Sequence, residues 1–161
     1  MDSKKIGMLV GAFVLGMLIM GLLLWSIMPS MMLSEHKSTL GFEETVAAIN
    51  ASAIEQGWKV PAVHNIQGSL HKAGHTDMGR ATIIELCQPD YAYAILKNDD
   101  EKIMTAMMPC RIGVYEKSNG EVYVSTMNVG IMGMMFGGNI ATVMGQVSKE
   151  DEEILQEIVV E

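Results

Sequence analysis

An uncharged stretch near the start of the chain restricts the fold more than any other feature of this sequence. From Ile6 to Met28 there are 23 residues without a charged side chain. An α-helix rises about 1.5 Å per residue, so about 20 apolar residues cross the roughly 30 Å hydrocarbon core of a bilayer. The stretch predicts a transmembrane helix at residues 6–28, with residues 1–5 as a cytoplasmic N-terminus and residues 35–161 as a separate domain.

A cleaved secretory signal is the alternative interpretation of this stretch. Such signals have an apolar region of about 7–15 residues that ends at a small-x-small cleavage site. The apolar run is longer than that, and residues 27–31 (Ile-Met-Pro-Ser-Met) offer no such site. Lys4 and Lys5 precede the run, so the positive-inside rule keeps the N-terminus in the cytoplasm. We therefore expect a single-pass protein of the cell membrane with an extracytoplasmic, or periplasmic, C-terminal domain.

The charge of the domain limits its partners. Of the 11 basic and 19 acidic residues, Lys4, Lys5 and Asp2 precede the apolar run, which leaves nine basic against eighteen acidic residues and a net charge of −9. Nucleic acid requires a basic surface, so a nucleic-acid partner is not expected. Docking of the domain on anionic lipid is disfavoured for the same reason. The expected membrane contact is the bilayer around residues 6–28.

Apolar periodicity after residue 30 predicts a mixed domain. The expected strands are residues 31–38, 58–63, 81–86, 111–116 and 122–127, and helices are expected to begin near Phe42, Ile66, Pro89 and Ser148. Pro61 cannot donate to a strand ladder, so the second strand is expected at a sheet edge. This order predicts an α+β fold in which helices cover one face of an antiparallel sheet of four to five strands.

Residues 129–147 leave two interpretations open. The segment holds 19 uncharged residues, five of them glycine. A second membrane crossing is one possibility, although five glycines, Asn139 and Gln146 make a poor transmembrane helix. The favoured interpretation is a glycine-hinged, methionine-rich segment for packing or binding.

The two cysteines lie where the chain leaves one predicted strand and enters another. If these strands are antiparallel neighbours, Cys87 and Cys110 meet at one sheet end, within the Cα separation of about 4.4–6.8 Å that a disulfide needs. Strand alternation places Cys110 with Ile112 and Val114, so the two thiols can also point to opposite faces. Cys87 precedes a helix N-terminus, which favours a reactive thiolate. Disulfide, functional thiol and inert buried cysteine all stay open.

Methionine sulfur is the other unusual chemistry of the sequence. Met104, Met107 and Met108 have i, i+3, i+4 spacing, and Met134 and Met135 follow in the glycine-rich segment. Thioethers and thiolates are soft ligands that select Cu(I), and methionine also serves as an axial haem ligand. Methionine also fills irregular core space without any ligand.

Two sequence blocks resemble a known family. They are Cys87-Gln88-Pro89-Asp90-Tyr91-Ala92 and Met108-Pro109-Cys110-Arg111-Ile112-Gly113-Val114-Tyr115-Glu116. From about Glu35 to the C-terminus the chain resembles the family called domain of unknown function 302. The resemblance implies a β-α-β4-α fold like half of the TATA-binding protein, often paired as a dimer, and it implies no established activity. Some members look associated with haem or sulfur metabolism. The anchor and the methionines of 127–144 lie outside the common pattern.

A binding module with a soft-ligand site, for haem or Cu(I), is the favoured hypothesis. The candidate cofactor-binding residues are Cys87, Cys110, Arg111, Met108, Met134 and Met135, and the candidate metal ligands are Cys110, Met104, Met107 and Met108. The sequence carries no nucleophile elbow, P-loop or dinucleotide fingerprint, so no catalytic residue is expected and binding is favoured over catalysis. The alternatives are a thiol redox protein using Cys87 and Cys110, and a non-catalytic interaction domain acting as a homodimer.

Overall fold

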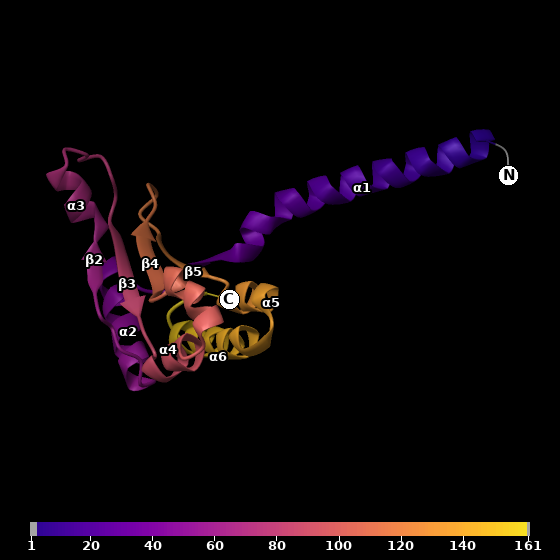
Figure 1. The fold of residues 1–161 in the computed structure, drawn as a ribbon. Coiled ribbons are helices and arrows are strands. Elements are labelled where there is room, and N and C mark those ends of the chain that lie inside the picture. The colour runs from indigo at the N-terminus through magenta and orange to yellow at the C-terminus, as the bar shows by residue number, and fades with distance from the viewer. Residues whose placement is uncertain (1–2, 161) are drawn as a thin grey trace. The chain divides into compact units, whose positions relative to one another are not determined.

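A computed structural model describes residues 3–160 (Figure 1), which divide into the N-terminal helix and a compact domain from Leu33 onward. The elements are α1 (Ser3–Met32), β1 (Leu33–Lys37), α2 (Phe42–Glu55), β2 (Val63–Asn65), α3 (Ile66–Lys72), β3 (Ala81–Leu86), α4 (Pro89–Leu96), the 3₁₀ helix η1 (Asp99–Met107), β4 (Cys110–Glu116), β5 (Val122–Met127), α5 (Val129–Phe136) and α6 (Gly138–Leu155). The first two residues of the expected cytoplasmic segment 1–5 lie outside the described residues, and α1 already begins at Ser3.

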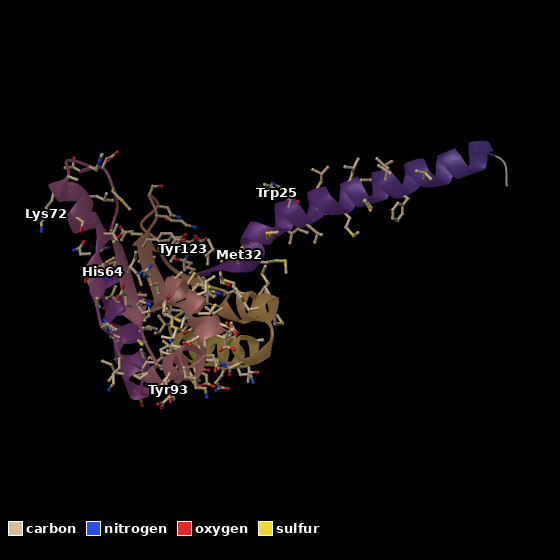
Figure 2. All side chains as sticks on the ribbon, viewed as in Figure 1. Trp25, Met32, His64, Lys72, Tyr93 and Tyr123 are labelled. Atoms are coloured by element: carbon tan, nitrogen blue, oxygen red, sulfur yellow. The ribbon has the colours of Figure 1, made fainter. Side chains whose placement is uncertain are left out.

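Helix α1 contains the apolar stretch that the sequence singled out. Its segment Val10–Met28 spans 19 residues and is the one helix in the described part of the chain that is long and apolar enough to cross a membrane. Figure 2 shows side chains of carbon and sulfur projecting around the helix. This is the composition of a signal anchor or a signal sequence.

The domain is built on a five-stranded antiparallel sheet in the order β1-β5-β4-β3-β2. This confirms the predicted α+β class. With α3, α4, η1 and α5 regarded as insertions, the order from β1 through α2 and β2–β5 to α6 is β-α-β4-α.

One face of the sheet forms the core. Strand side chains alternate between the two faces, and Ile84, Leu86, Ile112, Val114 and Val124 all turn to the face that is buried. Helix α2 packs on β3 and β4 and contacts α6, which in turn contacts α4. The opposite face is more polar.

The strand register brings four strand ends together. Leu33 pairs with Met127, Ile112 with Thr126, and Leu86 with Cys110. The starts of β1 and β4 therefore lie at the same sheet end as the ends of β3 and β5. We call this the β1-start end of the sheet; both cysteines and the junction between α1 and the domain lie there.

Local backbone signals specify several element boundaries. Gly57, at φ 83°, follows the end of α2, where a left-handed backbone favours glycine. Asn65 caps α3 by accepting a hydrogen bond from the Gly68 N–H at 2.6 Å. Pro89 is the first residue of α4, and Gly120 turns the hairpin between β4 and β5.

One predicted strand and the predicted starts of two other elements are wrong. Residues 58–63 are not a strand: Lys59 forms a single bridge with Cys87, and β2 begins only at Val63, after Pro61. The first strand begins at Leu33 instead of residue 31, because α1 continues to Met32.

The third correction concerns the last helix. Ser148 does not begin it, since α6 starts at Gly138 and runs through this serine. Residues 129–147 are accordingly shared between α5 and α6, and α6 buries one face in the domain core, so the segment is not a second crossing.

Gly133 controls the contact between α5 and α6, and its replacement is predicted to destabilise the domain. A Cβ at this position would lie 2.5 Å from the Cβ of Met144, so Gly133→Ala is expected to cost about 1–3 kcal/mol of unfolding free energy by overpacking. Gly145→Ala is the matched control, because its Cβ meets no described atom within 4 Å and alanine favours a helix by about 1 kcal/mol. Denaturant unfolding of both variants checks this; equal effects would contradict the packing argument.

Candidate functional site

An apolar pocket of about 500 Å³ is lined by four sulfur-containing residues. Cys87 follows β3, Cys110 begins β4, Met108 precedes Pro109, and Met144 comes from α6. We call this cavity the sulfur pocket. Its other lining includes Trp58, Pro61, Glu85, Leu86, Gln88, Tyr91, Ala92, Ile95, Leu96, Thr105, Pro109, Val143 and Val147. Two thiols and two thioethers in an apolar cavity form a soft donor set.

Cys110 is a protonated thiol at neutral pH. Its side chain shares the core-facing side of β4 with Ile112 and Val114, as strand alternation predicted. Burial raises the pKa of the Cys110 thiol to about 12, with further contributions from the negative charges of Asp151 and Cys87. Cys110 is therefore a poor nucleophile without a partner that replaces its proton.

Cys87 differs from Cys110 in its surroundings. It is half-buried, exchanges two backbone hydrogen bonds of 2.9 Å with Lys59, and lies two residues before the first residue of α4. Both cysteines are free thiols. Although they come from neighbouring strands with opposite alternation, both line the sulfur pocket.

The remaining candidate residues lie elsewhere in the domain. Met104 is 1% exposed and belongs to the core, while Met107 packs against the core from η1. Arg111 is exposed, with its Nε 3.5 Å from a Glu85 carboxylate oxygen. Met134 and Met135 are 67% and 75% exposed on α5. Of the eight candidates, the structure brings Cys87, Cys110 and Met108 together in one cavity.

Sequence reasoning did not connect Met144 to the cysteines. Its i, i+3 relation to Val147 and its neighbour Val143 mark one apolar face of a helix, which is the usual core pattern. The η1 spacing was also misleading: Met104 and Met107 lie within the 3₁₀ helix, whereas Met108 has extended backbone beyond it. Met108 is thus free to line the pocket beside Pro109.

Glu150 of α6 holds the aromatic wall of the sulfur pocket in place. The Trp58 indole N–H donates to Glu150 Oε2 at 2.9 Å, and the Tyr91 hydroxyl donates to Oε1. The two rings meet edge to face, with centroids 6.2 Å apart. Burial pushes the pKa of Glu150 up, but hydrogen bonds from Tyr91, Gln146 and Trp58 outweigh it and hold that pKa below its ordinary value.

Removing this acceptor is predicted to destabilise the domain. Trp58 is only 2% exposed, so Glu150→Ala leaves its N–H buried without a partner, at a cost of about 1–3 kcal/mol. Glu150→Gln keeps one acceptor oxygen and is expected to recover part of the loss. Chemical unfolding of the two variants, with exposed Glu153→Ala as control, measures this; an unchanged Glu150→Ala variant would contradict the assignment.

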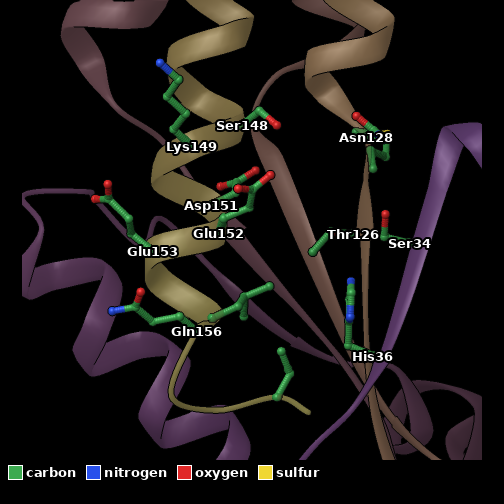
Figure 3. Close-up of a pocket in the computed structure, with 13 residues that line it drawn as sticks. Ser34, His36, Thr126, Asn128, Ser148, Lys149, Asp151, Glu152, Glu153 and Gln156 are labelled. Atoms are coloured by element: carbon green, nitrogen blue, oxygen red, sulfur yellow. The ribbon is translucent and has the colours of Figure 1, made fainter. Parts of the chain in front are cut away.

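A second pocket, of about 620 Å³, lies between α6 and the paired strands β1 and β5. Figure 3 shows the Asp151 and Glu152 carboxyl groups pointing from α6 toward the strands, where Thr126, Asn128 and Ser34 lie. We call it the acidic pocket. It shares α6 with the sulfur pocket but presents oxygen in place of sulfur.

Asp151 is the unusual group of the acidic pocket. Burial raises the pKa of its carboxyl to about 7, and the charges of Glu150 and Glu152 contribute. Its Oδ1 is buried without a hydrogen-bond partner among the described residues. The same carboxyl raises the pKa of Cys110, so the two pockets are electrostatically coupled through α6.

The described part of the chain offers no cluster of the side chains that most often bind metal ions. Within residues 3–160, no three His, Cys, Asp or Glu side chains gather into a group that could hold a metal ion. A metal site in the sulfur pocket would therefore depend on methionine sulfur in addition to the thiols.

The fold and the pocket geometry define an α+β domain with a sulfur-lined pocket at the β1-start end of its sheet. Residues 34–158 match the family described as Domain of unknown function DUF302. The chain belongs to this family. Among solved structures it is similar to an uncharacterized conserved protein DUF302 from Bacillus stearothermophilus, with a TM-score of 0.70 and 20% identity over 79% of this chain and 98% of that chain. At this identity the likeness shows the fold alone. None of the curated proteins compared with the chain matches it.

Proposed function

We propose that this protein is a membrane-anchored extracytoplasmic binding module that takes Cu(I) in its sulfur pocket. One observation carries the proposal: Cys87, Cys110, Met108 and Met144 line the same apolar cavity. Cu(I) is a soft ion that prefers thiolate and thioether sulfur. The donors come from the β3–α4 connection, the start of β4 with its preceding loop, and α6, so the folded domain gathers them.

Proton release accompanies this binding. The pKa of Cys110 is raised to about 12, so the metal replaces a proton when this thiol becomes a ligand. The apparent Cu(I) affinity is expected to rise with pH, by about tenfold per pH unit for each proton displaced. The negative charge of nearby Asp151 disfavours a free Cys110 thiolate. A bound cation would offset this repulsion.

Haem fits the same pocket less well. Methionine and cysteine sulfur are possible axial ligands, but the described residues that line the cavity include no histidine, lysine or arginine. Arg111 pairs with Glu85, which lines the pocket, and is the nearest candidate for a haem propionate. Cu(I) needs only the sulfur atoms.

We propose further that α1 anchors this module on the outer side of the cell membrane. The arguments are the 19-residue apolar span, the two lysines before it and the absence of a small-x-small site after it. Extraction of cell membranes at alkaline pH tests the anchor: we expect the full-length mass in the membrane pellet. A mature protein that lacks residues 1–28 would show a cleaved signal instead.

Anaerobic competition between the detergent-purified protein and a coloured Cu(I) chelator tests the binding. We expect one Cu(I) per chain, held tightly enough to decolour the chelator complex. No withdrawal of copper at a twofold excess of protein would contradict the proposal. A Soret band in the protein as purified would instead support the hypothesis that the pocket binds haem.

A thiol redox function is the second candidate, favoured by two free thiols lining one pocket. In this reading the Cys87 thiolate attacks a substrate disulfide and releases one thiol. Cys110 then displaces the second thiol, and a Cys87–Cys110 disulfide remains. Mass spectrometry after treatment with oxidised glutathione would show the loss of two hydrogens.

A protein that binds no metal, resists oxidation and forms a dimer would be an interaction domain. The homodimer itself stays a prediction.

A further inference from the structure

An exposed apolar tip ends α5. Met134, Met135 and Phe136 are 67%, 75% and 52% exposed, whereas Val129 and Gly133 of the same helix are buried. The close approach of Gly133 to Met144 fixes which side of α5 faces the domain. The other side therefore turns its large apolar residues outward. We call residues 134–136 the α5 tip.

The strand register places α5 at the junction with the membrane helix. Helix α5 begins two residues after Met127, and Met127 pairs with Leu33, the first residue after α1. No linker separates Met32 from β1. An eight-residue helix is about 12 Å long, so the tip stays within about that distance of the β1-start end.

Charge distinguishes the tip from the rest of the domain. Residues 128–148 contain no acidic or basic side chain, although the domain as a whole carries a net charge of −9. An acidic domain is repelled by anionic lipid but can insert neutral apolar side chains among zwitterionic lipids. Methionine and phenylalanine suit the boundary between headgroups and acyl chains.

From this placement we infer that the α5 tip inserts into the surface of the bilayer that α1 spans, as a second membrane contact of the domain. The inference rests on the anchor part of the proposed function and does not depend on the ligand.

Tryptophan quenching by brominated lipid tests the inference on the full-length protein. The parent carries Trp25→Phe, which leaves Trp58, a core residue, as the baseline emission. Phe136→Trp in this parent is the probe, and Tyr93→Trp, at a position 71% exposed on α4, is the matched control. Both variants are reconstituted in phosphatidylcholine liposomes with bromine near the top of the acyl chains.

We expect the added emission of the Phe136→Trp variant to be mostly lost in brominated liposomes, while the Tyr93→Trp variant keeps its emission. Equal quenching of both, or of neither, would overturn the inference. Emission that shifts to the blue only at high protein density, without quenching, would mean that a second copy covers the tip and would also overturn it. Liposome flotation distinguishes a failure of this inference from a failure of the proposed anchor, because protein that does not float with the liposomes is not anchored in them.

Discussion

Asp151→Asn is expected to remove most of the loss of stability that the wild-type protein shows between about pH 4 and pH 7. The carboxyl is largely enclosed, and burial raises its pKa from the ordinary 3.8 to about 7. Its Oδ1 has no partner among the described residues, so ionisation leaves a buried charge poorly compensated.

The sign follows from proton linkage. Between the two pKa values the folded protein binds a proton at Asp151 that the unfolded chain does not, so the unfolding free energy falls as pH rises through this window. One pKa unit corresponds to about 1.36 kcal/mol, which makes the full effect at most about 4 kcal/mol. Asparagine has nearly the same shape and cannot ionise, so above pH 7 the variant should be the more stable protein.

Urea unfolding of the domain at several pH values measures this effect. Glu153→Gln is the matched control, because it removes one negative charge from an exposed position on the same wall of the acidic pocket. The control should follow the wild-type pH dependence. If the unfolding free energy of the wild type rose between pH 4.5 and pH 7 by as much as that of the Asp151→Asn variant, the raised pKa of this carboxyl would be contradicted.

The largest effect on ligand binding is expected from the cysteines. Cys110→Ala and Cys87→Ala should each lower Cu(I) affinity by at least about tenfold to 100-fold, the range that the loss of even a supporting partner produces at metal sites. Met108→Leu and Met144→Leu preserve apolar volume, so the fold should persist while each variant loses one sulfur donor. Met135→Leu is the control on the exposed side of α5.

Chelator competition ranks these variants, and thermal unfolding verifies that each remains folded. The four pocket substitutions should weaken Cu(I) binding, and Met135→Leu should not. Affinities that are unchanged in both cysteine variants would place the metal elsewhere on the chain.

Local signals explain why much of the fold was predictable. The apolar run specifies α1, Asn65 and Pro89 begin their helices, and Asn119-Gly120 turns a hairpin, each through backbone chemistry of neighbouring residues. The predicted strand at 58–63 is wrong because Pro61 cannot donate a hydrogen bond to a strand ladder, and only the bridge between Lys59 and Cys87 forms there.

The sites depend on contacts between distant residues, and these were harder to predict. Cys87 and Cys110 were placed at one sheet end from the strand order, but Met144 joins them only because α6 extends back to Gly138. Asp151 lies in an acidic stretch of α6, and no local pattern reveals that it faces β1 and β5 across the acidic pocket. Spacing predicts faces of an element, whereas a pocket requires the packing of several elements.

X-ray absorption at the copper edge of the Cu(I)-loaded protein tests most directly whether the sulfur pocket binds Cu(I). We expect a first coordination shell made of sulfur alone, which loses scatterers in the Cys110→Ala variant. A first shell dominated by nitrogen or oxygen, or a sulfur shell that is the same in wild type and the Cys110→Ala variant, would contradict it.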